Sequence, residues 1–162
     1  GEVAHQEFLH GEASDPRKRW VESLIESLGE TGSIVVYSGY EESLIRQLAE
    51  TFPEFKSAFK AILKRLWDLL SVIKSHYYHP AFNGSYSIKS VLPAVVPSLG
   101  YDDLAIQAGG QAAAEYYRMV FVESDWVEQA GIREALLRYC ERDTLAMVEL
   151  RRVLGEKADR HI

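Results

Sequence analysis

The sequence has 162 residues, of which 47% are hydrophobic and 26% charged, and its formal net charge is −6. This length and composition are typical of one globular domain, so residues 1–162 are predicted to fold as a single unit. The negative charge argues against broad attraction to nucleic acid or to an anionic membrane. It does not exclude an enzyme that holds divalent metal ions, because such sites are locally acidic.

The cysteine content and the hydrophobicity profile bear on the cellular compartment. The single cysteine, Cys140, excludes an intrachain disulfide and favours a reducing compartment. No apolar run approaches the length of a membrane span, and the first residues lack the basic and apolar regions of a secretory signal. The sequence therefore predicts a cytoplasmic protein without membrane association.

The first part of the chain predicts strands that alternate with helices. Residues 2–10 have the composition of an edge strand, and Asp15-Pro16 then begins a helix that continues to Gly29. Residues 33–37, SIVVY, form a short apolar run typical of a strand buried on both faces. The order of strand, helix and strand predicts a parallel sheet with helical crossovers. Helices at residues 40–50 and 54–66 follow, and residues 67–73 are ambiguous between a short strand and a helical turn, with Asp68 as a candidate cap.

Residues 76–87, HYYHPAFNGSYS, form an irregular segment rich in aromatic side chains. One interpretation is a stacking surface for the unpaired bases of single-stranded nucleic acid. The alternative is a loop whose aromatic rings pack down and cover an open end of the core. The four aromatic residues concerned are Tyr77, Tyr78, Phe82 and Tyr86.

The last third of the chain predicts three further helices. A short one follows Ser87 and is limited by Pro93 and Pro97, and a second begins at the glycine pair of residues 109–110. The third, at residues 132–154, is the longest strongly periodic segment, and residues 156–162 behind it are expected to fray.

The predicted helix at residues 132–154 carries a carboxylate on its apolar face. Asp143 is costly to desolvate there unless a cation, a metal or hydrogen-bond donors meet it. One interpretation is structural: Asp143 pairs with an arginine, or it marks a helix break. The other is functional: Asp143 binds a metal ion, and Tyr139 beside it orients a water molecule. The residues of this face are Ile132, Leu136, Tyr139, Asp143, Met147, Leu150 and Leu154.

A second candidate carboxylate lies in the first turn of the helix at residues 40–50. Glu41 and Glu42 both complement the helix dipole there. Glu41 also follows the carboxyl end of a buried strand, where open α/β sheets usually place their ligand sites.

Two motifs resemble those of the RNase H-like 3′–5′ exonucleases (DnaQ-like, DEDD superfamily), which include polymerase proofreading domains. Residues 139–143 form a Tyr-x-x-x-Asp that resembles the third motif of that superfamily, and Tyr40-Glu41 after SIVVY resembles the second. Together with SYSIKSVLP and YCERDTLAM, they closely resemble a group of uncharacterised bacterial proteins placed in this superfamily.

The resemblance implies an RNase H-like mixed sheet flanked by helices and a metal-dependent 3′–5′ exonuclease that hydrolyses phosphodiester bonds of nucleic acid. In that superfamily, four carboxylates hold two divalent ions, usually magnesium or manganese. In this chain Glu41 and Asp143 would be two of the four, and Tyr139 would orient the attacking water.

The first motif of that superfamily, an Asp-x-Glu on the opening strand, has no counterpart here. The sequence therefore resembles the downstream part of a nuclease domain whose first strand precedes Gly1. We expect weak binding of Mg or Mn, little or no catalysis by this chain, and self-association through an incomplete sheet. The alternative is a non-catalytic module, on a nuclease scaffold, that binds nucleic acid or another protein.

Overall fold

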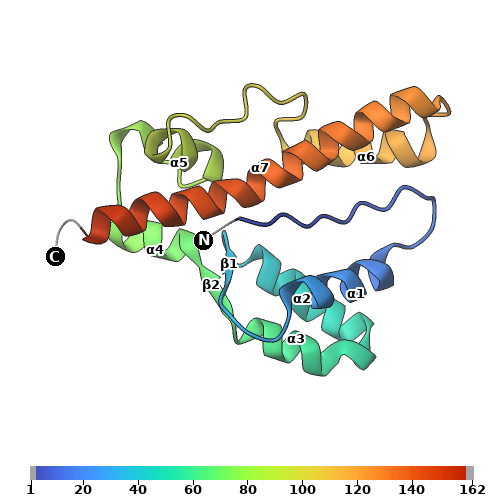
Figure 1. The fold of residues 1–162 in the computed structure, drawn as a ribbon, viewed down its shortest axis with the longest axis horizontal. Helices are drawn as coiled ribbons and strands as arrows, with labels where there is room; N and C mark the ends of the chain where they lie inside the picture. Colours follow the sequence, from blue (N-terminus) through green and yellow to red (C-terminus); the bar gives the residue numbers. More distant parts are fainter. Residues whose placement is uncertain (1–2, 160–162) are drawn as a thin grey trace.

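The computed structural model describes residues 3–159, and their architecture is predominantly helical (Figure 1). The one sheet among these residues has two parallel strands, β1 and β2, with Val36 opposite Asp68. The elements in chain order are α1 (Arg17–Leu28), β1 (Ile34–Val36), α2 (Tyr40–Thr51), the 3-10 helix η1 (Pro53–Phe55), α3 (Lys56–Leu63), β2 (Leu66–Asp68), α4 (Leu69–His76), the 3-10 helix η2 (Pro80–Phe82), α5 (Ile88–Val95), α6 (Gly109–Phe121) and α7 (Trp126–Asp159).

The predicted RNase H-like mixed sheet flanked by helices is wrong. Residues 3–10, expected to be an edge strand, form no backbone–backbone hydrogen bonds with another segment of the described chain. They run instead as an irregular segment beside α7, where Arg133 Nη1 donates to the Leu9 carbonyl at 2.9 Å (Figure 1). Strand composition was not sufficient, because a strand also requires a partner for its main-chain groups.

The predicted elements from residue 15 to residue 51 are confirmed. The side chain of Asp15 accepts a hydrogen bond from the Arg17 N–H at 3.0 Å at the start of α1, and Gly29, with φ 54°, follows its last residue. β1 lies inside the predicted apolar run, and α2 follows it. β1 pairs with β2 in parallel across α2 and α3, whereas the crossover predicted through α1, from a strand at residues 2–10 to the run at residues 33–37, does not form within the described residues.

α3 ends earlier than the predicted helix at residues 54–66 because the chain enters the sheet. The Ile34 N–H donates to the Arg65 carbonyl at 2.8 Å, which draws the following residues into β2. Asp68 ends β2 and begins α4, since its Oδ1 accepts a hydrogen bond from the Leu70 N–H at 2.9 Å.

The side chain of Arg65 fixes the connection between α1 and β1. Its guanidinium donates to the carbonyl oxygens of Leu28, Gly29, Thr31 and Gly32, over distances of 2.5 to 2.8 Å. Two of these carbonyls belong to the end of α1, where a positive charge also complements the helix dipole. One side chain thus closes the helix and holds the turn that follows it.

We expect Arg65→Ala to lower the free energy of unfolding by about 2–3 kcal/mol, because several hydrogen bonds to one charged group are lost together. Urea unfolding followed by circular dichroism measures the change. Arg46→Ala is the control, since Arg46 makes only a surface ion pair with Glu42 and should cost at most about 0.5 kcal/mol. Equal losses in the two variants would contradict the assigned role of Arg65.

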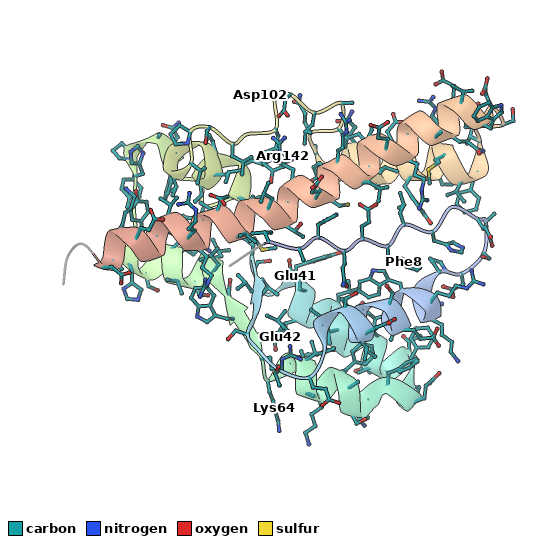
Figure 2. The ribbon with its side chains drawn as sticks, viewed as in Figure 1. Phe8, Glu41, Glu42, Lys64, Asp102 and Arg142 are labelled. Atoms are coloured by element: carbon teal, nitrogen blue, oxygen red, sulfur yellow. The ribbon has the colours of Figure 1, made fainter. Side chains whose placement is uncertain are left out.

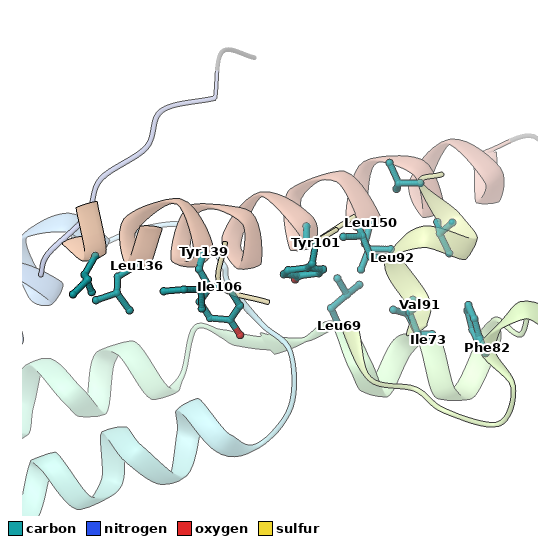
Figure 3. Packing of buried hydrophobic residues seen from close by; sticks show 14 of the residues in the cluster. Leu69, Ile73, Phe82, Val91, Leu92, Tyr101, Ile106, Leu136, Tyr139 and Leu150 are labelled. Atoms are coloured by element: carbon teal, nitrogen blue, oxygen red, sulfur yellow. The ribbon is translucent and has the colours of Figure 1, made fainter. Parts of the chain in front are cut away.

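The sheet lies between two hydrophobic cores. The smaller core joins α1, α2 and α3 and includes Val21, Ile45 and Phe59, with Ile34 of β1 packed against it. The larger core joins α4, α5, η2, α6 and α7, and Val35 of β1 packs against it (Figure 3). Successive residues of β1 thus contribute to opposite cores, as the alternation of a strand requires.

α7 spans the larger core and confirms the helix predicted at residues 132–154. It begins earlier, at Trp126, because Asp125 Oδ1 accepts a hydrogen bond from the Val127 N–H at 2.8 Å. Residues 156–159 continue the helix, and residues 160–162 lie outside the described part of the chain. Among residues 3–159, no helix combines the length and the apolar character that a membrane crossing requires.

Candidate functional site

Asp143 lies in the middle of α7, where the hydroxyl of a tyrosine from another segment meets it. Tyr101, in the connection between α5 and α6, donates a hydrogen bond to Asp143 Oδ1 at 2.6 Å. The neighbouring arginine, Arg142, pairs instead with Asp103 at 2.8 Å. α7 continues through Asp143 without a break, so the helix-break interpretation is wrong and a phenol, not an arginine, is the observed partner.

Tyr139 and Tyr101 form a buried aromatic pair beside Asp143. Their ring centroids are 6.2 Å apart (Figure 3). Burial, and then the negative charge of Asp143, raises the pKa of Tyr139 to about 12. Burial and the hydrogen bond to Asp143 also raise the pKa of Tyr101. Both phenols therefore remain protonated near neutral pH, and the Tyr101 hydroxyl donates its hydrogen bond to Asp143.

These two tyrosines make stability depend on alkaline pH. In the unfolded chain a tyrosine hydroxyl loses its proton near the ordinary pKa of 10.0, whereas burial in the folded protein raises the pKa of Tyr139 to about 12. The folded state then binds more protons than the unfolded state, so we expect the free energy of unfolding to fall as the pH rises between these two values. Below that range, the stabilisation is fully present.

Urea unfolding across this alkaline range, with tyrosine ionisation followed by ultraviolet absorbance, measures the effect. Tyr139→Phe should flatten the decline, because the residue that retains its proton is removed. The exposed Tyr40 offers the matched control Tyr40→Phe, which should leave the slope unchanged. The same slope in Tyr139→Phe and in the wild type would be evidence against a protonated, buried Tyr139.

Lys89 places a positive charge against the same pair of rings. Its Nζ lies 5.3 Å from the ring centroid of Tyr101 and 5.6 Å from that of Tyr139, and it donates to the carbonyl of Gln107. No carboxylate of the described residues forms an ion pair with Lys89. An acid, two phenols and the ammonium group of the exposed Lys89 thus lie in one cluster beside the larger core.

Glu41 is the second carboxylate of interest, and its environment differs sharply from that of its neighbour. Glu41 Oε2 is buried and has no hydrogen-bond partner in the structure. Glu42 forms a surface ion pair with Arg46 at 2.6 Å. Figure 2 shows Glu41 between α2 and α7, with Glu42 farther from α7. A buried carboxylate oxygen without a donor is unfavourable, and a cation would relieve that cost.

The described residues do not complete a two-metal site. Within residues 3–159, no three His, Cys, Asp or Glu side chains are grouped so that they could hold a metal ion. Other acids near the sheet and α7 have structural roles, since Asp68 caps α4 and Asp103 pairs with Arg142. The unpartnered oxygen of Glu41 fits one ligand of a cation, but the four-carboxylate set implied by the resemblance is not formed by these residues alone.

The aromatic segment at residues 76–87 packs mainly onto the core. Phe82 is only 1% exposed, and its ring centroid lies 5.8 to 6.1 Å from those of three tyrosines and of His79. Tyr78 is the one of the four candidates with most of its side chain exposed. Phe82 therefore fits the interpretation in which the loop covers the end of the core. Tyr78 is the ring best placed for stacking on a base.

Sequence reasoning missed two members of the cluster around Asp143. Tyr101 follows Gly100 in an irregular connection, where neither periodicity nor a motif distinguishes it. Lys89 belongs to the SYSIKSVLP segment and was not recognised as a site residue, since a lysine on a short helix is usually solvated. Both residues reach the cluster only through tertiary packing.

Comparison with known proteins gives one family match. The model of the Domain of unknown function (DUF2779) matches residues 1–87, which is more than half of the 162 residues. The chain belongs to the DUF2779 family. The matched DUF2779 region includes Glu41 and the aromatic segment and ends before α5. No curated protein and no solved structure matches the chain.

Proposed function

We propose that this chain provides part of a metal-dependent 3′–5′ exonuclease site, in which Glu41 and Asp143 bind Mg²⁺ or Mn²⁺ and the substrate is the single-stranded end of a nucleic acid. The observation that carries the proposal is the buried Glu41 Oε2 without a hydrogen-bond partner. A hard divalent cation is a suitable partner for such an oxygen, because it prefers carboxylate ligands.

The residues around Asp143 have roles that follow from their protonation and contacts. Tyr101 fixes one carboxylate oxygen of Asp143 by a 2.6 Å hydrogen bond. Tyr139, whose pKa is about 12, donates a hydrogen bond at neutral pH and orients a water without acting as a base. A bound divalent cation would polarise a phosphoryl oxygen and make water a better nucleophile.

Lys89 supports an anionic substrate. Its ammonium group lies against Tyr101 and Tyr139 and forms no direct ion pair with a carboxylate of residues 3–159. A phosphate near this cluster would gain a favourable charge interaction in a molecule whose net charge is otherwise −6. The local positive charge thus opposes the general repulsion of nucleic acid.

A labelled single-stranded oligonucleotide tests the proposal. In Mn²⁺ we expect slow shortening from the 3′ end that stops in EDTA and in Glu41→Gln. Glu42→Gln is the matched control, since Glu42 forms only a surface ion pair one residue along the same helix turn. Shortening that persists in EDTA and in Glu41→Gln would rule out this site.

A second candidate function is a non-catalytic module that binds single-stranded nucleic acid. It is favoured by the exposed ring of Tyr78 and by the lack of a complete metal-ligand group within residues 3–159. Binding that persists in EDTA, without shortening, and that is lost in Tyr77→Ala plus Tyr78→Ala would favour this candidate. Binding that requires Mn²⁺ favours the nuclease site.

A further inference from the structure

The end of the α6–α7 hairpin exposes a group of large apolar side chains, far along the chain from Glu41. We call this group the tip surface. Each of its members is between 54% and 77% exposed, and all of them lie within residues 117–127 at the hairpin end, so they are not scattered single residues. Figure 1 shows the hairpin end projecting away from β1 and β2. The tip surface consists of Tyr117, Phe121, Val122, Trp126 and Val127.

Local contacts hold the tip surface in a fixed shape. The rings of Tyr117 and Phe121, one turn apart on α6, pack with centroids 5.1 Å apart. In the connection to α7, Glu123 Oε1 accepts hydrogen bonds from the N–H groups of Ser124 and Asp125, both at 3.0 Å. Gln129 Nε2 donates to the Glu123 carbonyl at 2.6 Å. A surface ordered before binding loses little entropy when a partner docks.

The charge around the tip surface is negative. Arg118 of α6 is paired with Glu115, Glu123 and Glu128 at 3.2 to 3.5 Å, so three acids share one cation. Asp125 adds a further carboxylate at the start of α7. A groove of about 470 Å³ runs between α6 and α7 beside the tip surface, and Glu115, Val127 and Glu128 line part of it.

We propose that the tip surface docks a protein partner through a helix whose apolar face is edged by lysine and arginine. The exposed aromatic rings suit an apolar face, and Trp and Tyr commonly carry much of the binding energy at such interfaces. The surrounding carboxylates require positive charge on the partner. A second copy of this chain would place like charges against one another, and an anionic membrane or a nucleic acid would be repelled as well.

A fluorescein-labelled amphipathic helical peptide of leucine and lysine is the probe, and fluorescence anisotropy reports its binding to the full 162-residue chain. We expect Tyr117→Ser and Trp126→Ser each to weaken binding by at least about tenfold. Tyr40→Ser is the matched control, because Tyr40, like Tyr117, has most of its side chain exposed, and it should bind as the wild type does. Thermal unfolding shows whether each variant is folded.

Charge and alternative occupants are tested in the same experiment. Added salt should weaken binding of the leucine–lysine peptide, and a peptide with glutamate in place of lysine should not bind. The proposal is overturned if neither peptide binds, if both bind equally, or if the tip variants bind as the wild type does. It is also overturned if Tyr117→Ser abolishes self-association of the chain, because the tip surface would then bind a second copy. Loss of binding to phosphatidylserine vesicles in Trp126→Ser would overturn it as well, because the tip surface would then bind a membrane.

Discussion

If Asp143 belongs to the proposed nuclease site, replacing it by asparagine is expected to lower the slow Mn²⁺-dependent shortening of a single-stranded oligonucleotide by at least about 100-fold, which corresponds to about 2.7 kcal/mol of transition-state stabilisation. Asparagine retains a carbonyl oxygen that can accept the hydrogen bond of Tyr101, so the cluster is expected to keep its geometry. The negative charge that attracts a cation is lost. The rate of shortening at saturating Mn²⁺ measures the effect.

Asp103→Asn provides the matched control for this substitution. Asp103 also lies close to α7, but its carboxylate is committed to Arg142, and the Asp103 side chain is 65% exposed. Its removal should leave the rate of hydrolysis within about twofold of the wild type. Comparable losses in Asp143→Asn and Asp103→Asn would indicate a general effect on α7 and would contradict a specific role for Asp143.

Replacing Phe82 by alanine lowers the free energy of unfolding by about 3–5 kcal/mol. The ring is only 1% exposed and fills the space between α4, α5 and the aromatic segment, so its removal leaves a cavity. It also removes edge and tilted ring contacts with Tyr77, Tyr78 and Tyr86. Urea unfolding followed by circular dichroism measures the loss.

The exposed Tyr78 separates the packing role of this segment from a binding role. Tyr78→Ala should cost less than about 1 kcal/mol of stability, because its ring makes only one edge contact, with Phe82. If the segment stacks on bases, the same substitution weakens oligonucleotide binding by about 1–3 kcal/mol. A small stability loss in Phe82→Ala would contradict the assignment of Phe82 to the core.

The elements that sequence patterns predicted correctly are those whose stability is mostly local. α7 has a strong apolar period, α1 has Asp15 and Gly29 at its ends, and β1 is a short apolar run. The helix predicted at residues 54–66 extended past Leu63, where α3 ends, because the end of α3 depends on the pairing of Ile34 with Arg65. That contact joins segments distant in the sequence and leaves no local pattern.

The predicted sheet failed at residues 3–10 for a related reason. Their alternation indicates which side chains prefer burial, and Leu9 does pack against the larger core. Alternation does not supply a neighbouring strand, and none of the described residues pairs with this segment. Whether an amphipathic segment becomes a strand is decided by main-chain partners elsewhere in the structure.

The candidate site could be predicted in part. Asp143 could be predicted as a site residue because a carboxylate on an apolar helix face costs free energy to desolvate. Glu41 could be predicted because it follows the carboxyl end of a buried strand, where ligand sites are common. The phenol of Tyr101 and the ammonium of Lys89 could not be predicted, because Tyr101 lies in an irregular connection and Lys89 on an exposed position of a short helix. Likewise, only the structure distinguishes the buried Glu41 from the surface pair of Glu42 and Arg46.

Direct measurement of Mn²⁺ binding tests the central claim, a cation site that includes Glu41. Electron paramagnetic resonance quantifies free Mn²⁺ in the presence of the wild type, Glu41→Gln and Glu42→Gln. The proposed site predicts saturable binding that weakens by at least about tenfold in Glu41→Gln, because a buried ligand charge is removed, and that is unchanged in Glu42→Gln. No saturable binding by the wild type, or equal affinity in all three proteins, would contradict it.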